Sequence, residues 1–360
     1  MSRFDWSASL ETVGAMVVGS NQQVIVGGLF NHAQCRQRTG LARFQADGYI
    51  DDTFAPVLSP APSRIEPVVA ALVLQPDGRL IIGGKFSAAN GYACPGLARL
   101  NYDGSTDPSF APTQALVAVQ ALVLQPDQKV LVAGATTLND YGIPETPALL
   151  RLLPNGLPDP SFSFTNAYQD LIRNLLLLPD GKILVNGTLR LNPDGTQDGT
   201  FTSVELEGYM VCASLLQPDG KVLLALSDPE GAYPTTGGAL VRLLPGGGYD
   251  PSFTTQTFYR DSSAEGITAN LFALALQADG RIYVGGGFGA IGDDASTLVA
   301  RLWPNGELDR SFQPSFTYSP GADLPEFVTH LAIQADGKLL VGGYFGGING
   351  FSRQNLARLH

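Results

Sequence analysis

The sequence predicts an all-β fold: a seven-bladed β-propeller made of four-stranded antiparallel blades. One phrase, for example LQPDGRLIIGG from Leu74, returns along the 360 residues, and a second phrase of the type Leu-Ala-Arg-Leu follows each copy at a steady distance. The period is about 50 residues, which lies in the range of four-stranded propeller blades. The last residues of the seven copies of the first phrase are Gly28, Gly84, Gly134, Gly187, Leu226, Gly286 and Gly343.

Each repeat supplies four short segments that read as strands. In the second copy these are residues 71–74, 79–84, 97–100 and 107–110, the last being an Asp-x-Ser/Thr-Phe motif. Pro-Asp-Gly and Asn-x-Asp-Gly separate the segments, and Asp and Gly tolerate the positive φ of tight turns. The segments are apolar on both faces, as expected when every sheet is covered by a neighbour on either side. We therefore expect strand, turn, strand, loop, strand, turn, strand in each repeat.

The two ends of the chain suggest closure into one domain over residues 1–360. The seventh copy stops at His360, directly after its third strand, and Met1-Ser2-Arg3-Phe4 resembles the missing fourth segment. We expect the N-terminal strand to complete the last blade, because closure leaves few unprotected strand edges. The fourth blade, residues 172–201, lacks its upper loop between the second and third strands, and Asn186-Gly187 suits a two-residue type I′ turn.

The recurring phrases resemble the delta-60 repeat family, bacterial propeller repeats that are common in secreted and surface proteins. The resemblance covers nearly the whole chain, with departures at Ser20-Asn21-Gln22 and at Leu226. It implies an extracellular or cell-surface location and supplies no general catalytic residues. The chain as given has no signal-peptide pattern.

The charge of the chain separates into two parts. The formal net charge of −11 argues against nucleic acid and anionic membranes, which both require clustered Lys and Arg. Recurring positions hold 15 acids and 13 bases, so the remaining 18 acids and 9 bases carry most of the negative charge. An arginine of the third strand recurs with an Asp eight residues later, which predicts an ion pair or an Arg-to-backbone contact in each blade.

The excess acids fall in loops that we expect on one face of the propeller. They include Glu205, Glu207, Asp228, Glu230, Asp261, Glu265, Asp293, Asp294, Asp323 and Glu326. Aromatic residues accompany them: Tyr141, Tyr209, Tyr233, Phe258, Tyr259, Tyr318 and Phe327. This face is either a solvated rim or a surface that binds a protein or a carbohydrate. Calcium is a further alternative, although no run has the oxygen spacing of a calcium-binding loop.

One column of the innermost strands mixes different chemistry while its neighbours stay apolar. We expect these side chains at the mouth of a central channel, where polar groups converge on a ligand or on trapped water. The predicted ligand-binding residues are Gln120, Arg173, Cys212 and Thr329 of this column, together with Asn174 and His330 at the next position, where the other five repeats have alanine.

The sequence predicts a non-catalytic, monomeric binding or scaffold module without a cofactor. Three scattered histidines and three scattered cysteines do not form a metal or redox motif. The alternative is a hydrolase or lyase that uses the channel mouth around Arg173 and His330.

Overall fold

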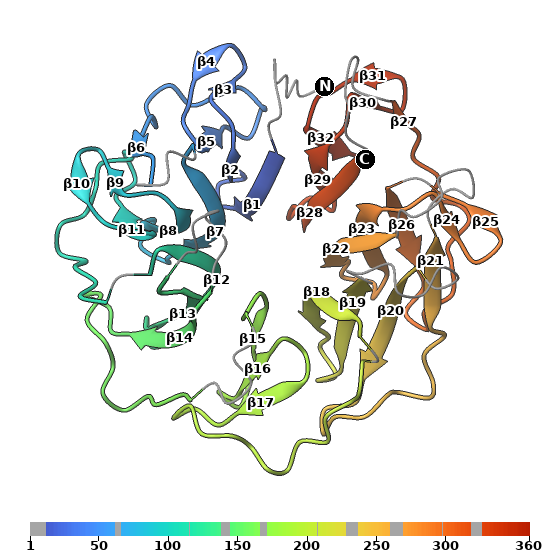
Figure 1. Ribbon diagram of the computed structural model, residues 1–360. Helices are drawn as coiled ribbons and strands as arrows, with labels where there is room; N and C mark the ends of the chain where they lie inside the picture. The colour runs from blue at the N-terminus through green and yellow to red at the C-terminus, as the bar shows by residue number, and fades with distance from the viewer. Residues whose placement is uncertain are drawn as a thin grey trace. The chain divides into compact units, whose positions relative to one another are not determined.

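The structure is a computed structural model (Figure 1). It describes residues 12–61, 66–114, 116–137, 145–165, 171–206, 208–227, 237–259, 269–296, 298–317 and 326–360. Every regular element in these ranges is a β-strand, which confirms the all-β prediction for the described residues. Among them there is no helix long and apolar enough to cross a membrane.

The repeating unit is an antiparallel meander of three strands. Seven such meanders follow one another in the described residues. Their strands are β1 (Thr12–Val18), β2 (Val24–Leu29) and β5 (Leu41–Phe44); β7 (Val68–Leu74), β8 (Leu80–Lys85) and β11 (Leu97–Leu100); β12 (Ala118–Leu124), β13 (Val130–Ala135) and β14 (Pro147–Leu152); β15 (Leu175–Leu177), β16 (Ile183–Val185) and β17 (Leu189–Leu191); β18 (Met210–Leu216), β19 (Val222–Ser227) and β20 (Gly238–Leu243); β22 (Asn270–Leu276), β23 (Ile282–Gly287) and β26 (Val299–Leu302); and β28 (Phe327–Ile333), β29 (Leu339–Tyr344) and β32 (Leu356–Leu359).

The Asp-x-Ser/Thr-Phe motif forms a turn where the sequence predicted a fourth strand. In the second repeat the amide and hydroxyl of Ser109 both donate to Oδ1 of Asp107, at 2.9 and 2.7 Å. Such local side-chain bonds compete with a sheet ladder, so only an isolated bridge from Leu100 to Thr106 remains. The predicted N-terminal strand of the last blade falls in residues 1–11, outside the described residues.

In the part of the chain that the structure describes, short hairpins extend the loop between the second and third strands of four repeats. Their strands are β3 (His32–Ala33) and β4 (Arg36–Gln37), β9 (Ala88–Ala89) and β10 (Tyr92–Ala93), β24 (Ala290–Ile291) and β25 (Asp294–Ala295), and β30 (Gly347–Ile348) and β31 (Phe351–Ser352). Segments that lead from one repeat to the next pair with three of them: β6 (Leu58–Ser59) with β9, β21 (Gln256–Tyr259) with β24, and β27 (Phe316–Thr317) with β30.

The tip of the second hairpin folds back to the turn after the third strand. Asn90 has a φ of 48°, and its Nδ2 donates to the main-chain oxygen of Gly104 at 2.9 Å. The side chain of Asn90 therefore ties the tip of this long hairpin to the short turn.

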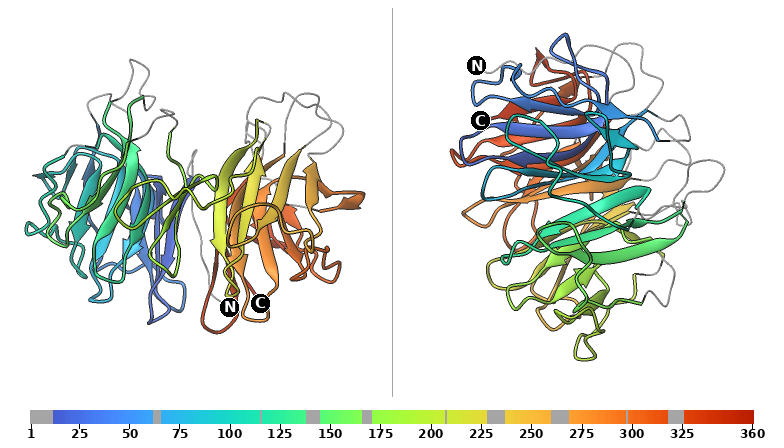
Figure 2. Two further views of the ribbon diagram at one scale, coloured as in Figure 1. Left: turned by 90° about the horizontal axis from the view of Figure 1, so that it is seen from below. Right: turned by 90° about the vertical axis from the view of Figure 1, so that its left-hand side faces the viewer.

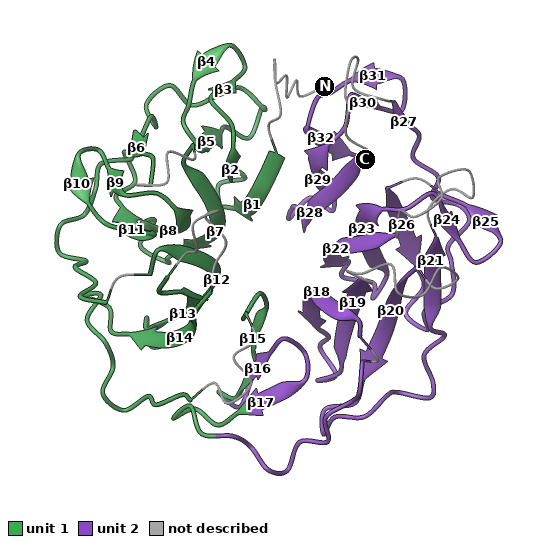
Figure 3. Ribbon diagram, viewed as in Figure 1, with its two compact units in different colours: residues 1–177, 181–183, 191–196 green, residues 178–180, 184–190, 197–360 purple. Residues whose placement is uncertain are grey.

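The chain divides into two compact units (Figure 3). Unit 1 comprises residues 1–177, 181–183 and 191–196, and unit 2 comprises residues 178–180, 184–190 and 197–360. Within unit 1 the innermost strand β7 packs between β1 and β12, and within unit 2 β22 packs between β18 and β28 (Figures 1 and 2). Each unit has its own apolar clusters, which join residues of successive meanders, as Leu41 of the first meander and Val69 of the second are joined in unit 1.

The double glycine of the repeated phrase is explained by two close approaches. A Cβ on Gly83 would lie 2.4 Å from Cγ1 of Val119 in the next meander. A Cβ on Gly84 would lie 1.9 Å from the main-chain oxygen of Val68 in its own innermost strand. The first glycine therefore allows one meander to pack against the next. The second allows the innermost strand of the same meander to lie close to the second strand.

The fourth meander has the shortest connection between its second and third strands. Asn186 and Gly187 have φ values of 46° and 72°, and the amide of Thr188 donates to the oxygen of Val185 at 3.2 Å. Positive φ at both central residues is what a type I′ turn requires.

Candidate functional site

The recurring arginine of the third strand serves the fold. In the second repeat Nε of Arg99 donates to Oδ2 of Asp107 at 2.8 Å, and Nη2 donates to Oγ of Ser109 at 3.0 Å. Nη1 reaches the main-chain oxygen of Pro154 in the next repeat at 2.6 Å. The guanidinium carbon also lies 4.9 Å from the ring centroid of Phe110. One side chain thus makes an ion pair, a cation–π contact and a link to the following repeat.

The same ion pair is present in six repeats, which confirms that prediction for them. The pairs are Arg43 with Asp51, Arg99 with Asp107, Arg151 with Asp159, Arg190 with Asp198, Arg242 with Asp250, and Arg301 with Asp309. The link to a carbonyl of the next repeat is present for the first five arginines. These recurring charges are therefore occupied by structural contacts.

The buried carboxylates stay ionised. Burial alone would raise the pKa of Asp107, but hydrogen bonds from Ser109, Arg79 and Arg99 outweigh it and hold this pKa far below its usual value. At Asp250 the hydrogen bond from Ser252 is the largest influence, and the pKa is lowered in the same way. An acid held this firmly in the charged form is unsuited to proton transfer near neutral pH.

The mixed-chemistry column of the sequence is a column of β-bulges. In the third meander Val119 faces Gly134 and Ala121 faces Ala133, so Gln120 is the extra residue between them. The same shift recurs in five further meanders. The six bulge residues are Gly14, Ala70, Gln120, Cys212, Phe272 and Thr329, and all are half-buried. A bulge re-aims a side chain out of the regular ladder, and bulges are frequent beside binding sites.

The predicted ligand-binding residues lie on the innermost strands or just before them. Gln120 lies on β12, whereas Arg173, which is exposed, and Asn174, which is half-buried, directly precede β15. Their chain positions place these three in unit 1, but Cys212 on β18 and the adjacent Thr329 and His330 on β28 belong to unit 2. Convergence of the six on one ligand therefore stays a prediction.

Local contacts hold the bulge residues of unit 2. The hydroxyl of Thr329 donates to the oxygen of Gly342 at 3.3 Å, and the thiol of Cys212 lies 3.9 Å from the oxygen of Met210. The Phe272 ring packs edge-on against Phe327, with centroids 5.9 Å apart. Polar and aromatic groups are thus presented from equivalent backbone positions.

The structure describes only part of the acidic loop face. Glu207, Asp228, Glu230, Asp261, Glu265 and Asp323 lie outside the described residues. Glu205 and Asp293 are exposed, as a loop face requires. Asp294 instead forms two short bonds to Arg310, of 2.9 and 2.6 Å, and Glu326 is buried. In the described ranges no group of three His, Cys, Asp or Glu side chains is placed to hold a metal ion.

The aromatic residues of these loops divide between core and surface. Tyr141, Tyr233 and Tyr318 lie outside the described residues. Tyr259 is 36% exposed, whereas its neighbour Phe258 is fully buried, with its ring centroid 4.9 Å from that of Phe288. Phe258 is therefore not part of a binding face, because β21 is paired with both β20 and β24 and directs this ring into the core. Tyr209 and Phe327 are half-buried.

The sequence pattern of one family of β-propeller domains of unknown function, DUF5122, matches six segments that together exceed half of the chain. They are residues 20–54, 75–110, 125–162, 178–201, 277–312 and 334–360. The chain belongs to the DUF5122 beta-propeller family. The fifth repeat, in which Leu226 replaces the second glycine, lies outside the matched segments. None of the curated proteins matches the sequence.

Solved structures with a similar fold come from several bacteria. A protein of unknown function from Bacteroides caccae is 16% identical, with a TM-score of 0.46, over 80% of this chain and 92% of that one. Catalytically inactive virginiamycin B lyase from Staphylococcus aureus, crystallised with quinupristin, is 14% identical, with a TM-score of 0.50, over 85% and 88%. The extracellular domain of a putative one-component system from B. thetaiotaomicron is 14% identical, with a TM-score of 0.40. That alignment covers 96% of this chain but only 46% of the other, so the chain spans less than half of its length.

Proposed function

We propose that this member of the DUF5122 beta-propeller family is a non-catalytic binding or scaffold module that acts outside the cytoplasm. Its ligand, a carbohydrate or a protein, contacts the bulge column of the innermost strands and the loops that lead into them. The proposal includes the finer architecture expected from the repeats, namely seven blades in one ring.

The observation that carries the proposal is the contrast between two repeated positions. The third-strand arginine is the same residue in every repeat, and in six of them its side chain is engaged by the aspartate of its own repeat. The bulge position has one backbone geometry but carries Gly, Ala, Gln, Cys, Phe or Thr. Fixed geometry with varied side chains is the way that rigid scaffolds present recognition residues.

The chemistry presented there suits recognition better than bond cleavage. Gln120 and Thr329 supply neutral hydrogen-bonding groups, and Phe272 supplies an aromatic surface. Aromatic rings stack on sugar faces and on apolar side chains, while amides and hydroxyls fix orientation. The competing proposal is a hydrolase or lyase. Such an enzyme would need Arg173 and His330 to act together on one substrate.

Binding to glycan and peptide arrays, followed by titration of any hit, tests the proposal. Gln120→Ala and Phe272→Ala should each weaken binding by about tenfold, the effect of one lost contact of about 1.4 kcal/mol. Arg36→Ala, an exposed variant away from the column, should bind like the parent protein. Binding that neither column variant changes would contradict the proposed location. Product formation from the bound ligand, lost in His330→Ala, would favour the competing proposal.

A further inference from the structure

In the first and sixth repeats, an ion pair at equivalent positions joins the hairpin between the second and third strands to the turn after the third strand. In the first repeat Arg36 and Arg38, on the returning arm of the hairpin, bind the two carboxylate oxygens of Asp52 at 3.1 and 3.2 Å. In the sixth repeat the charges are exchanged, and Asp294 of the hairpin binds Arg310 at 2.6 Å. Asp52 and Arg310 both directly follow the recurring aspartate of their repeats. We name this contact the rim clasp.

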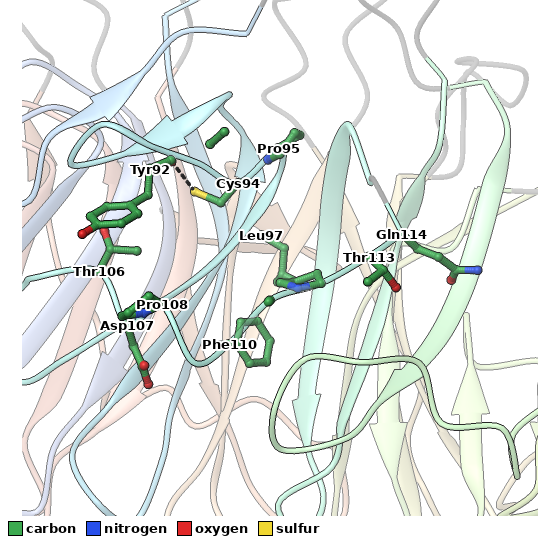
Figure 4. Close-up of a pocket in the computed structure, with 13 residues that line it drawn as sticks. Tyr92, Cys94, Pro95, Leu97, Thr106, Asp107, Pro108, Phe110, Thr113 and Gln114 are labelled. Carbon is green, nitrogen blue, oxygen red and sulfur yellow. Dashed lines mark hydrogen bonds between the residues drawn. The ribbon is translucent and has the colours of Figure 1, made fainter.

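The second repeat has no charge at the rim-clasp positions. Tyr92 stands where the first repeat has Arg36, Cys94 where it has Arg38, and Pro108 where it has Asp52. A cavity of about 280 Å³ opens there, between the returning arm of the hairpin and the segment that leads to the next repeat (Figure 4). The cavity is thus located where a neutral sequence replaces the ion pair.

The lining of this cavity is mostly apolar. Tyr92, Pro95, Leu97 and Pro108 line one part, and Phe110 lies beneath them in Figure 4. Tyr92 is 55% exposed, so its ring stands at the entrance. Thr113 and Gln114 are exposed on the far side and supply a hydroxyl and an amide for hydrogen bonds.

Neither the Asp107 carboxylate nor the Cys94 thiol of the lining favours binding of a charged ligand. The carboxylate of Asp107 is already bonded to Arg79, Arg99 and Ser109. Burial raises the pKa of the Cys94 thiol, which therefore stays protonated at neutral pH, and its Sγ lies 3.2 Å from the oxygen of Tyr92. An ionic ligand would lose hydration here without gaining an opposite charge.

We propose that the second repeat binds a small neutral molecule, consisting of one apolar ring with one or two hydrogen-bonding groups, in this rim cavity. The volume is at the lower end of ligand pockets, roughly 300 Å³ upward, so a single ring fits better than a large ligand. The ring packs among the prolines and Phe110, and its polar group meets Thr113 or Gln114. This site lies within unit 1 and does not depend on the proposed function of the bulge column.

Cysteine labelling resolved by peptide mass spectrometry tests the proposal, with phenol and cyclohexanol as probes. Cys94 lies in the cavity wall, whereas Cys35 and Cys212 lie elsewhere and serve as internal controls. A saturating probe should slow N-ethylmaleimide labelling of Cys94 at least threefold and leave the other two rates unchanged. The proposal would be overturned if neither probe changed the labelling rate of Cys94, or if the probes slowed the labelling of all three cysteines equally.

The chain itself supplies the matched variants. Tyr92→Arg with Pro108→Asp copies the clasp of the first repeat, and Tyr92→Asp with Pro108→Arg copies that of the sixth. Both double variants should fold, shown by an unchanged β-sheet circular dichroism spectrum, and both should lose the protection of Cys94 by phenol. Protection that persists in a folded clasp variant would place the probe outside the cavity and overturn the proposal.

Discussion

The guanidinium of Arg43 lies against the ring of Tyr102, 4.4 Å from its centroid, and donates to the main-chain oxygen of the same residue at 2.5 Å. Tyr102 belongs to the second repeat and Arg43 to the first, so this contact joins consecutive meanders. The guanidinium also contacts the ring of Phe54 in its own repeat, whose centroid is 4.5 Å from the guanidinium carbon. Arg43 is 2% exposed and ion-paired with Asp51 at 2.8 Å. A single buried cation thus holds both its own repeat and its neighbour.

Arg43→Met should lower the free energy of unfolding by about 3 to 5 kcal/mol, because it leaves the buried charge of Asp51 without its partner. Arg99→Met should cost less, since Asp107 keeps a second ion pair with Arg79 at 2.9 Å. Urea unfolding at neutral pH measures both values. The matched control is Arg36→Met: this arginine is exposed, and the change should cost about 1 kcal/mol or less. Equal costs for Arg43→Met and Arg36→Met would contradict this account.

Gly84→Ala should destabilise the protein by about 3 kcal/mol, because the new Cβ would meet a main-chain oxygen at 1.9 Å and backbone must move. Gly199→Ala is the control, since nothing lies within 4 Å of the position of its Cβ. That change should be neutral or slightly stabilising, because alanine restricts the unfolded chain. Thermal unfolding of the two variants checks the prediction. A Gly84→Ala protein as stable as Gly199→Ala would show that the strands adjust without cost.

The repeated phrases made much of this fold predictable. Double glycines, Asp-Gly turns and Leu-Ala-Arg-Leu segments recur because each has the same structural role in successive repeats, so a single sequence reveals them. The fourth strand was mispredicted because Asp107 bonds its own neighbour Ser109, a competition that a strand pattern does not show. The fold-back of the hairpin depends on Asn90 reaching Gly104, a tertiary contact without a sequence signature.

The candidate sites were predictable to a smaller extent. The mixed column was found in the sequence by comparing repeats, but its nature as a row of bulges needed the strand register. Phe258 and Tyr259 are adjacent aromatic residues, and only the pairing of β21 decides which one is buried. The rim cavity could have been found by comparing Arg36 and Asp52 with Tyr92 and Pro108, had the repeats been aligned over their hairpins.

Stability should fall on acidification because the paired aspartates have lowered pKa values in the folded state. Such groups stabilise the fold above the unfolded pKa, about 4, and lose that contribution as the pH falls further. The urea midpoint should therefore change little from pH 7 to 5 and drop steeply below about pH 4. Asp107→Asn should be less stable than the parent at pH 7, and the difference should shrink as the pH falls. A constant difference down to pH 3 would contradict the role of this ion pair.

Replacing adjacent aromatic residues separates core from surface at the end of β21. Phe258→Ala should cost about 3 to 5 kcal/mol, because a fully buried ring and its edge-on contact with Phe288 are lost and a cavity remains. Tyr259→Ala should cost about 1 kcal/mol or less, since that ring is 36% exposed. Urea unfolding gives both numbers, and binding assays on the folded Tyr259→Ala protein then ask whether this tyrosine contacts a ligand. A larger loss of stability at Tyr259 than at Phe258 would mean that the register of β21 with β20 and β24 is shifted by one residue, since a one-residue slip exchanges the two faces of a strand.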